Sequence, residues 1–598
     1  MTAPARLAFA ALVVATVAAF FVTQKLKSSP PLVVRPHLSV VFSPDPDARV
    51  RKAKISFWIV NGDDVSVSIV DREGRIVRRL LDGFPLRERV RITRWWNGRT
   101  DAGAVAPDGR YRVRVALIHQ GRTIDLAQPI RLDTRPPRPR VVSVEPRAGE
   151  RPAFLPQEGI DAVTVRVAGT ERRRSRLQIW RTDVTPPRRV GQIAIPFDQD
   201  TARWDGTLGA RPAPAGTYLI GVLVADRAGN AGTSPRTLPP RPGQVGGPAG
   251  VTIRYLAAAP PLAPVRAGER ATVLVDARGK PYRWALRRFG EPQVLARGRG
   301  HNVRLRLRVP RGQSGLHVLT LTSGEHRVAV PLAVRTTKPR AVLVVLPALT
   351  WQGRARLDDD GDGMPDTLDA PVRRPAVRLA RPFTRLPASI ASGEGALLRF
   401  LDEDLLRYDL TTDAALATDS GPALEGHRGV VLAGDLRWVT PELSALLRRY
   451  VRGGGRVWSL GVDSLRRVVG LQDGRLAGPA PPRATDALGA RPRQPLERPD
   501  VPATITTYLD DPGIDLFGGT GGAFPGYGVY EALASFAPGA ELLAAAGPEA
   551  EVPVIAAWRL GDGLAVHSGL PELAERALAG DLDAAALVRR LWAVSAGG

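Results

Sequence analysis

A motif that occurs twice in the first half of the chain constrains the fold more than any other feature. Both copies place a Trp-x-Gly turn before a Pro-x-Gly-x-Tyr turn: Trp96-Asn97-Gly98 with Pro107-Asp108-Gly109-Arg110-Tyr111, and Trp204-Asp205-Gly206 with Pro214-Ala215-Gly216-Thr217-Tyr218. Self-similarity at a fixed period, here about 108 residues, indicates one structural module repeated in tandem. Strand-like segments surround each copy, and the clearest alternates Val65, Val67 and Ile69 with polar residues. The sequence therefore predicts successive β-sandwiches, in which each Trp closes one end of a core and each Tyr begins a strand.

The first copy has a further turn between its two ends, Asp101-Ala102-Gly103. This combination resembles the FlgD-type immunoglobulin-like domain, a β-sandwich found on many exported bacterial proteins. The second copy keeps both ends and lacks the middle turn. The resemblance implies two such domains, over 38–135 and 138–238, which act as spacers or binding platforms. A third segment, 250–336, also alternates but lacks the Trp motif, and we expect it to form a third β-sandwich.

The pattern changes after residue 340, where short apolar runs replace the alternating segments. Three of these runs are typical of strands that are buried on both faces of a parallel sheet: 341–346, 429–434 and 456–461. A helix is expected between the last two, with Thr440 as its N-cap and Pro441 as its first residue. Strands that alternate with helices across short loops predict a doubly wound α/β domain over 340–598.

Several stretches of this half match a known family: 343–351, 399–402, 408–413, 430–434, 449–457 and 558–563. They resemble the C-terminal domain of the N,N-dimethylformamidase large subunit, which has a glutamine amidotransferase-like fold. In that family two tyrosines and a glutamate hold an iron. Arg437 stands at the first tyrosine position of this chain, and a guanidinium has no lone pair to offer a metal. The second tyrosine is not evident in 463–467.

The residues of an amidotransferase nucleophile are also missing. The chain contains no Cys, and His567 is followed by Ser568-Gly569 where those enzymes have His-x-Glu. Ser459 or Ser464 with His567 would form a hydrolase pair only if a third group oriented the base. We therefore expect a non-catalytic domain and assign no catalytic residues. Hydrolysis of amide or other C–N bonds is the alternative.

One loop concentrates negative charge in a chain whose formal net charge is +25. Residues 358–369 include six Asp residues, and two carboxylates about 5 Å apart repel by roughly 3 kcal/mol at an effective dielectric constant near 20. Such a loop either spreads its side chains into water or binds a cation. The spacing fits positions 1, 3, 5, 6, 7, 9 and 12 of the calcium-loop template: Asp358, Asp360, Asp362, Gly363, Met364 through its carbonyl, Asp366 and Asp369.

The sequence therefore predicts a structural calcium site with six ligands: Asp358, Asp360, Asp362, Met364, Asp366 and Asp369. Asp369 is shorter than the Glu of the template, and this departure resembles the loops of dockerin and thrombospondin type 3 repeats. A solvated acidic turn is the alternative. Bound calcium would fix a long insertion that has little apolar content of its own.

The N-terminal segment predicts where the protein acts. Residues 7–23 are uncharged and almost wholly apolar, with Arg6 before them and Lys25 and Lys27 after them. We expect a transmembrane signal anchor within 1–27 and a linker over 28–37. Secretion after cleavage of a signal peptide is the alternative. The body would then lie outside the cytoplasm, held at the cell membrane by a single pass, where the calcium concentration suits a weak site.

Composition limits the partners. The absence of Cys excludes disulfides, cysteine-ligated zinc and a thiol nucleophile. Most of the positive charge is Arg, and the sequence lacks a nucleic-acid module with stacked aromatic residues, so we expect no nucleic acid partner. The expected protein is multidomain, with an N-terminal transmembrane helix, two or three immunoglobulin-like β-sandwiches and a C-terminal α/β doubly wound domain. It would bind a cell-surface ligand, either a cell-envelope polymer or a protein.

Overall fold

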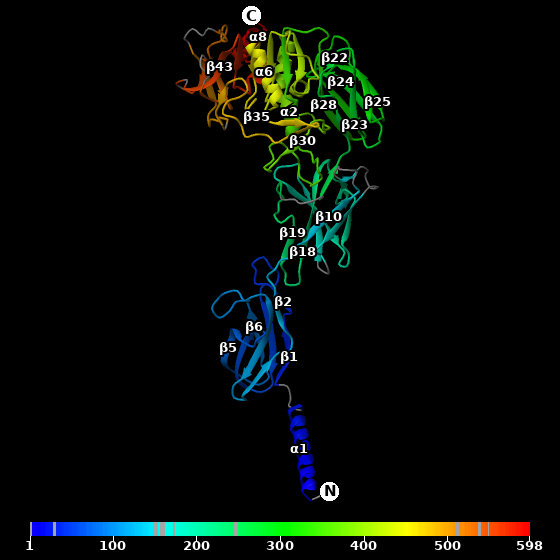
Figure 1. Ribbon diagram of the computed structural model, residues 1–598, viewed down its shortest axis with the longest axis vertical. Helices are drawn as coiled ribbons and strands as arrows, with labels where there is room; N and C mark the ends of the chain where they lie inside the picture. Colours follow the sequence, from blue (N-terminus) through cyan, green and yellow to red (C-terminus); the bar gives the residue numbers. More distant parts are fainter. Residues whose placement is uncertain are drawn as a thin grey trace.

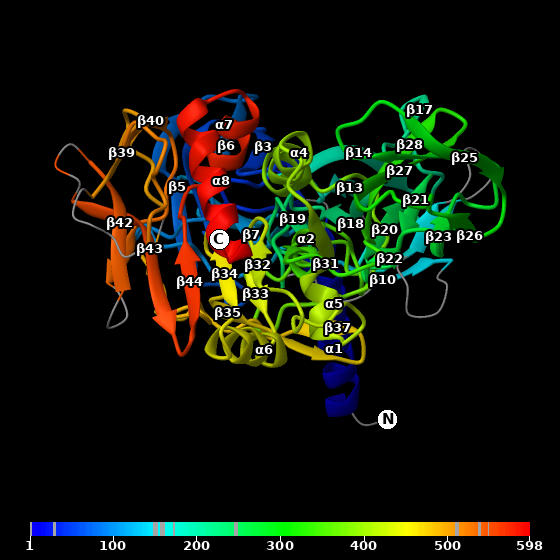
Figure 2. The same ribbon diagram turned by 90° about the horizontal axis from the view of Figure 1, so that it is seen from above.

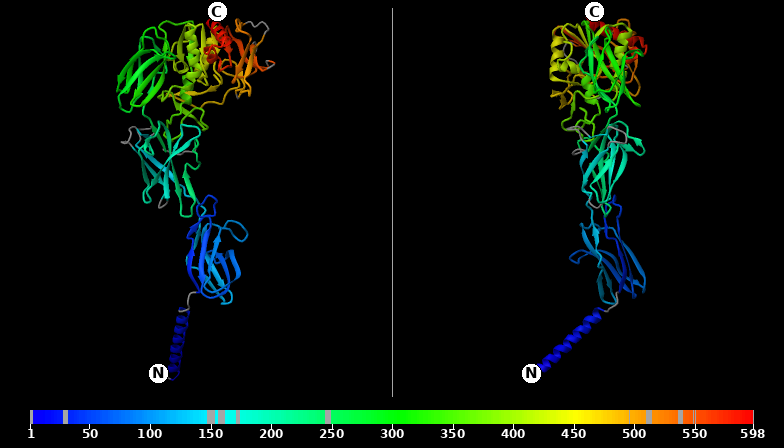
Figure 3. Two further views of the ribbon diagram at one scale, coloured as in Figure 1. Left: turned by 180° about the vertical axis from the view of Figure 1, so that it is seen from behind. Right: turned by 90° about the vertical axis from the view of Figure 1, so that its right-hand side faces the viewer.

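The computed structural model describes the chain except for a few short segments: residues 1–2, 28–31, 147–152, 156–161, 171–173, 244–248, 495, 509–513, 536–539, 548, 550 and 598. The parts form an elongated row, with helix α1 (Ala3–Lys27) at one end, two β-sandwiches next, and a larger unit that contains the C-terminus at the other end (Figures 1 and 3). Strands account for 43% of the chain and helices for 14%, so the protein is mostly β.

Helix α1 exposes every side chain that is described along it, over residues 8–23. Among the described residues, no helix combines the length and the apolar character that crossing a membrane requires. The transmembrane helix expected within 1–27 is thus not found.

The first sandwich packs two sheets face to face. The smaller has the order β1 (Val33–Leu38), β3 (Ala53–Ile59), β6 (Arg91–Trp96). The larger has the order β2 (Val41–Phe42), β9 (Ile130–Leu132), β7 (Gly109–Leu117), β4 (Asp63–Val70), β5 (Ile76–Leu86), with β8 (Arg122–Asp125) paired to β7. Alternate residues of β4 and β7 point into a core of their own, as the alternating pattern indicates.

The second sandwich repeats this plan. Its smaller sheet is β10 (Arg140–Glu145), β12 (Val163–Ala168), β15 (Thr201–Trp204). Its larger sheet is β11 (Ala153–Leu155), β20 (Gly250–Ile253), β18 (Gly216–Ala225), β13 (Arg174–Arg181), β14 (Arg188–Ile195), with β19 (Ala231–Ser234) on β18. Strand β20 pairs with β18, so residues 250–253 complete the second sandwich. The predicted boundary at residue 250 is therefore corrected: the third sandwich begins after residue 253.

The repeated motif has the same geometry in both sandwiches. Each Trp donates from Nε1 to the backbone oxygen three residues on, at 3.0 Å for Trp96 and 2.9 Å for Trp204. Each Tyr hydroxyl donates to the backbone oxygen of the Pro four residues before it, at 2.5 Å for Tyr111 and 2.7 Å for Tyr218. The Trp and Tyr rings of each pair meet edge to face. The local motif therefore closes one end of each core, as expected.

The third sandwich joins the large unit. Its sheets are β21 (Ala257–Ala259), β23 (Arg270–Asp276), β26 (Arg304–Arg308), and β22 (Val265–Arg266), β28 (His326–Arg335), β27 (Gly315–Ser323), β24 (Tyr282–Arg288), β25 (Val294–Gly300). Its buried residues are continuous with those of the following sheet in one core, whereas the first two sandwiches have separate cores.

A nine-stranded mixed sheet forms the rest of the large unit. The order is β31 (Tyr408–Thr412), β29 (Val342–Leu346), β32 (Gly429–Leu432), β34 (Arg456–Ser459), β44 (Gly563–His567), β43 (Val552–Leu560), β42 (Ala540–Ala546), β39 (Ala503–Thr507), β40 (Ala523–Tyr527). Neighbours from β31 to β44 pair in parallel, and the remaining pairs are antiparallel. The apolar runs 341–346, 429–434 and 456–461 thus contain parallel strands, but the doubly wound α/β description is not supported for the whole of 340–598.

Helices cover both faces of this sheet (Figure 2). On one side lie α4 (Glu394–Glu403), α7 (Leu573–Leu578) and α8 (Leu582–Ala596), and on the other α2 (Ala348–Arg354), α5 (Asp413–Ala417) and α6 (Pro441–Arg452). The N-cap of α6 is Thr440, whose hydroxyl accepts from Leu443 N at 3.2 Å. Helix α3 (Ala388–Ser392) leads into α4, and short strand pairs such as β30 (Ala376–Arg378) with β37 (Arg475–Ala477) lie outside the main sheet.

Candidate metal centre and the pocket beside it

The acidic loop, residues 358–369, lies between α2 and β30. Its base is an antiparallel bridge in which Asp366 N donates to Leu357 O at 2.7 Å. Gly361 and Gly363 adopt φ values of +84° and +86°, which only Gly adopts without strain. These turns fold the loop back on itself, and its aspartates are thereby brought toward one another.

Three aspartates form a group that could hold a metal ion. Asp358, Asp360 and Asp366 each offer a carboxylate oxygen, and these oxygens all lie within 4.8 Å of one another. The two oxygens of Asp358 also accept backbone hydrogen bonds, from Gly361 N at 2.6 Å and Gly363 N at 3.0 Å. Carboxylate oxygens are the ligands that Ca²⁺ prefers, and each retains a free lone pair after one backbone bond.

The electrostatics of the loop disfavour bare charges. Burial, together with the neighbouring aspartates, raises the pKa of Asp358 well above its usual value. The same two causes raise the pKa of Asp362 to about 7 and that of Asp366 to about 6. A divalent cation in the group would offset the mutual repulsion, which adds to burial in raising these pKa values.

One of the expected ligands, Asp369, lies apart from this group and is engaged in an ion pair. Asp369 pairs with Arg437 and lies 3.7 Å from Arg354 Nε, so the last position of the calcium template is occupied by an ion pair. Met364 N donates to Asp362 Oδ1 at 2.6 Å, which turns Asp362 toward the backbone. Of the five predicted carboxylate ligands, the structure brings Asp358, Asp360 and Asp366 into one group.

Sequence reasoning missed a buried cation beside the loop. Arg381 is 2% exposed; its Nη1 donates to Asp366 O at 3.0 Å and lies 3.5 Å from Asp359 Oδ2, and its Nη2 donates to Gln352 O. Asp359 also accepts from Arg378 N at 2.9 Å. Arg381 therefore offsets the charge of Asp359, and its charge also lowers the pKa of Asp366 in part. No local signal in the sequence marks an Arg that lies 15 residues beyond Asp366.

The loop is also the joint to the second sandwich. Gly361 O accepts from Gly250 N at 2.9 Å, and Gly363 O accepts from Thr182 Oγ1 at 2.6 Å. A Cβ at Gly250 would lie 2.5 Å from Asp358 Oδ2. The backbone of the acidic loop thus touches strand β20 directly, where the second sandwich meets the large unit (Figure 1).

A pocket of about 500 Å³ lies beside this joint, with walls from both units. The second sandwich contributes Arg181 and Arg254, and the large unit contributes Trp351, Arg356 and Asp435. This volume is within the range of small-molecule sites. Arg356 reaches back across the joint, because its Nη2 donates to Thr182 O at 3.0 Å. The pocket therefore depends on how the two units are held together.

A buried glutamate lies behind the pocket wall. Glu394 is fully buried, and its Oε1 accepts from Trp351 Nε1 at 2.7 Å and from Ser389 Oγ at 2.8 Å. Its Oε2 has no hydrogen-bond partner among the described residues. Burial raises its pKa. Trp351 and Ser389 both line the pocket, so they connect this carboxyl to it. No sequence motif marks Glu394 as a functional residue.

Further polar residues gather at the carboxyl ends of the parallel strands, where such folds bind ligands. Glu531 and His567 are buried, with Oε2 and Nε2 3.2 Å apart. Asp463 N donates to Glu531 Oε1 at 2.7 Å, and the Asp463 carboxylate accepts from Arg437. The Ser464 hydroxyl is engaged by backbone groups, including Leu436 N at 3.1 Å. The Arg437 guanidinium thus belongs to this cluster of polar residues.

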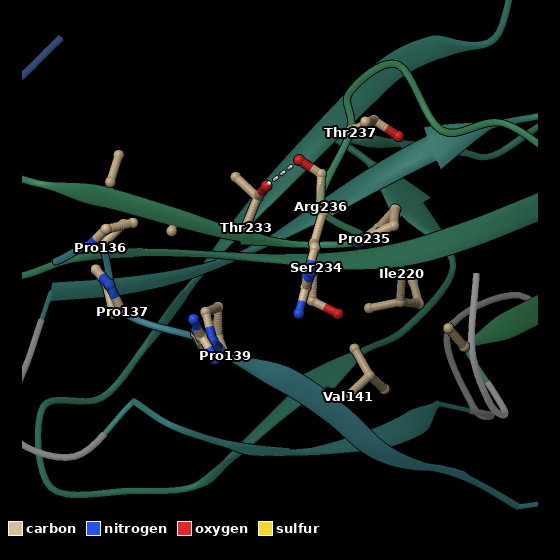
Figure 4. Close-up of a pocket in the computed structure, with 14 residues that line it drawn as sticks. Pro136, Pro137, Pro139, Val141, Ile220, Thr233, Ser234, Pro235, Arg236 and Thr237 are labelled. Atoms are coloured by element: carbon tan, nitrogen blue, oxygen red, sulfur yellow. Dashed lines mark hydrogen bonds between the residues drawn. The ribbon is translucent and has the colours of Figure 1, made fainter. Parts of the chain in front are cut away.

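A larger hollow, of about 770 Å³, lies on the second sandwich (Figure 4). Pro136, Pro137 and Pro139 line one side of it, and Ser234 and Pro235 line the other. The only hydrogen bond drawn among the lining residues joins Thr233 Oγ1 to Arg236 O, at 3.3 Å. No carboxylate lines this hollow among the described residues, and it offers no cluster of catalytic or metal-binding groups.

Comparison with known proteins gives low similarity. No protein-family model and no curated protein matches the chain. Among solved structures, the fibronectin(III)-like modules of CbhA from Clostridium thermocellum are 14% identical over 37% of this chain and 91% of theirs, with a TM-score of 0.19. FlgD from P. aeruginosa is 20% identical over 23% of this chain and 91% of its own, with a TM-score of 0.13. A β-galactosidase from Bacillus circulans sp. alkalophilus is 16% identical over 32% of this chain, which spans only 26% of that enzyme, with a TM-score of 0.23.

None of the comparisons supports a dimethylformamidase-like domain over 340–598.

Proposed function

We propose that this protein is an exported binding protein, in which a row of β-sandwiches presents a calcium-stabilised, non-catalytic C-terminal unit to a cell-surface ligand. The observation that carries the proposal is the group formed by Asp358, Asp360 and Asp366. At separations within 4.8 Å, each pair of charged carboxylates repels by about 3 kcal/mol at an effective dielectric constant near 20. Calcium would offset this repulsion, and extracellular sites of this kind bind at about 10⁻⁴ to 10⁻³ M.

Calcium at this position would act on the joint between the units. The loop that carries the three aspartates accepts hydrogen bonds from Gly250 and Thr182 of the second sandwich. Fixing the loop would therefore fix the angle between the sandwich and the large unit, together with the pocket that both of them line. The ligand would bind to this pocket, whose geometry the bound cation would stabilise.

Calorimetric titration with CaCl₂ tests the proposal. The unaltered protein is expected to bind one ion, and a double variant, Asp360→Asn with Asp366→Asn, is expected to lose that binding. Asp369→Asn is the matched control, because Asp369 belongs to the same loop and pairs with Arg437 instead. Equal affinity in all three proteins, or no binding in any, would refute the calcium site.

Location outside the cytoplasm, at the membrane, belongs to the same proposal. It is supported by the large apolar side chains that α1 exposes, among them Phe9, Val14 and Phe21. These residues would associate with lipid, and the body would lie beyond the membrane. Protease added to intact cells is expected to cleave the body. A body that survives until the cells are lysed would contradict export.

A second function is favoured by one contact, that between Glu531 and His567. A buried His beside a carboxylate is the arrangement of a general base with the group that orients it. The alternative proposal is a hydrolase of amide or other C–N bonds. Hydrolysis of N,N-dimethylformamide or simple amides that is abolished by His567→Gln would favour it. Equal turnover by both proteins, or by neither, would dismiss it.

A further inference from the structure

The outer face of the larger sheet in the third sandwich is strongly basic. Five arginines on it surround a hollow of about 590 Å³ whose floor is made of small or hydroxyl side chains. We call this surface the arginine face: Arg283, Arg287, Arg297, Arg299 and Arg327, with Ala285, Thr320 and Thr322 between them. Strand β25, which carries Arg297 and Arg299, is the edge strand of its sheet. The hollow therefore lies near an open edge of the large unit, at the outer side of Figure 1.

Strand register explains why the arginines meet. Arg283 of β24 lies opposite Arg299 of β25 on one side and opposite Thr322 of β27 on the other. Thr322 in turn lies opposite Arg327 of β28. Directly opposed residues share a face, with Cβ atoms about 5 Å apart. Across strands β25, β24, β27 and β28, one row of side chains therefore consists of Arg299, Arg283, Thr322 and Arg327.

The neighbouring row of residues on the same face, Arg297, Ala285 and Thr320, has shorter side chains at its centre and forms the floor of the hollow. Ala285 lies opposite Arg297 and Thr320, so a methyl group is flanked by a guanidinium and a hydroxyl. Trp284 pairs with Gly298, and a Cβ at that glycine would lie 2.8 Å from the indole ring. Trp284 is packed against the core, on the other side of the sheet from Arg283. The exposed side of the arginine face is therefore formed by guanidinium, hydroxyl and methyl groups.

These arginines lack counterions. Arg283, Arg297, Arg299 and Arg327 are exposed, and within the described part of the chain no side-chain hydrogen bond or ion pair joins their guanidinium groups to another residue. Elsewhere in the same sandwich the pattern is the opposite: Arg278 pairs with Asp276, and Arg288 with Asp402 at 2.5 Å. Like charges directly opposite in a sheet destabilise it. An arrangement that costs stability and has no internal partner is explained by an external anion.

We propose that the arginine face binds a linear anionic polysaccharide. Sulfate, phosphate or carboxylate groups along such a chain would be held by successive guanidinium forks. Sugar hydroxyls would bond to Thr320 and Thr322. A sheet face open at its edge suits a polymer that passes across it. Single-stranded nucleic acid is a weaker fit, because its non-specific binders offer exposed aromatic rings for stacking. Trp284 is the one aromatic residue among the described residues that line the hollow, and its ring packs against the core.

The test compares two triple variants that lose equal charge. One, Arg283→Ala with Arg297→Ala and Arg299→Ala, empties the arginine face. The other, Arg140→Ala with Arg188→Ala and Arg189→Ala, removes three exposed arginines from the second sandwich. Binding to dextran sulfate is measured by calorimetry at about 0.15 M salt, where long-range attraction is screened beyond roughly 8 Å. Neutral dextran of equal length, a single-stranded oligonucleotide and vesicles of phosphatidylglycerol are the comparison probes.

Dextran sulfate is expected to bind the unaltered protein and neutral dextran is not. The first triple variant should lose affinity at least tenfold, and the second less than threefold. Because repulsion is relieved, the first variant should melt no lower than the unaltered protein. If both triple variants lost affinity for dextran sulfate equally, the binding would depend on net charge alone, and the proposal would fail. It would also fail if dextran sulfate did not bind, if oligonucleotide or vesicles bound as tightly, or if the first variant melted lower.

Discussion

Arg437 donates from Nε and Nη2 to a single oxygen of Asp369, at 3.1 and 2.9 Å. The contact ties the end of the acidic loop to the polar cluster at the carboxyl edge of the parallel strands. The same guanidinium also donates to Asp463, whose backbone N in turn donates to Glu531. Asp369, at the end of the acidic loop, and the cluster around His567 are therefore parts of one connected set of charges.

Removing this guanidinium should destabilise the large unit. Arg437→Ala leaves Asp463, which is 12% exposed, with fewer compensating charges, and the expected loss is about 1–3 kcal/mol. Urea denaturation measures it. Arg399→Ala is the control, because its pair with Glu403 is exposed and should contribute less than about 1 kcal/mol. Equal losses in the two variants would show that Arg437 is an ordinary surface residue.

Calcium should raise the melting temperature of the protein. A ligand that binds only the folded state at a concentration 100 times its dissociation constant stabilises that state by about 2.7 kcal/mol. Differential scanning calorimetry with CaCl₂ and with a chelator gives the shift. Asp369→Asn should keep the shift, and the Asp360→Asn, Asp366→Asn variant should lose it. If the melting temperature is the same with CaCl₂ and with the chelator, calcium does not stabilise the protein, and the charge of Arg381 would be sufficient for the stability of the acidic loop.

Local motifs were readable from the sequence, and long-range contacts were not. Trp96 and Tyr111 lie close together in the chain, so their spacing predicts a contact that the structure shows. Asp369 fits a calcium template over twelve residues, but that template cannot register a guanidinium 68 residues further on. The same template places Asp358, Asp360 and Asp366 together, and the structure brings their carboxylates close to one another, while the binding of calcium by them stays a prediction.

The register between paired strands is the second feature that could not be predicted from the sequence. The arginines of β24 and β25 read as ordinary exposed positions of alternating strands. Only the pairing of Arg283 with Arg299, which a bulge between Leu286 and Arg287 leaves in place, brings them together. The burial of Glu394 could not be predicted for the same reason. Glu394 begins helix α4, where a carboxylate is common, and the contact that helps to bury it is with Trp351, 43 residues earlier in the chain.

A methyl group at Gly250 should loosen the joint. In Gly250→Ala the new Cβ would lie 2.5 Å from both Asp358 Oδ2 and Gly363 N, so loop and strand must separate. The expected cost is about 1–3 kcal/mol. Because Asp358 would shift, calcium affinity should also fall by about tenfold, or 1.4 kcal/mol. Denaturation and calorimetric titration measure the two effects.

The control for the joint is Gly470→Ala. Its nearest neighbour, Ala477 O, would lie 3.5 Å from the new Cβ, an ordinary contact, and no loss of stability or affinity is expected. If Gly250→Ala binds calcium as tightly as this control, the contact between the second sandwich and the loop has no influence on the site.

Asp413 should make stability depend on pH. Burial, followed by the charge of Glu394, raises its pKa to about 8, while Asp413 Oδ1 accepts from Leu349 N at 2.9 Å. In the unfolded chain the group ionises near pH 4. Between these values the folded state binds one more proton than the unfolded state, so the free energy of unfolding falls as pH rises, by up to about 1.4 kcal/mol per unit. The stabilising effect is complete below pH 4 and lost by about pH 8.

Asp413→Asn removes this titration while it keeps the shape and the acceptor oxygen. The variant should match the stability of the unaltered protein near pH 4 and exceed it increasingly from pH 5 to pH 8, as measured by urea denaturation across that range. Asp562→Asn, at an exposed position, serves as the control and should follow the unaltered protein. If the Asp413→Asn and unaltered curves run parallel from pH 5 to pH 8, the buried carboxyl carries no proton in the folded state, and its unpartnered Oδ2 must then be balanced by another charge.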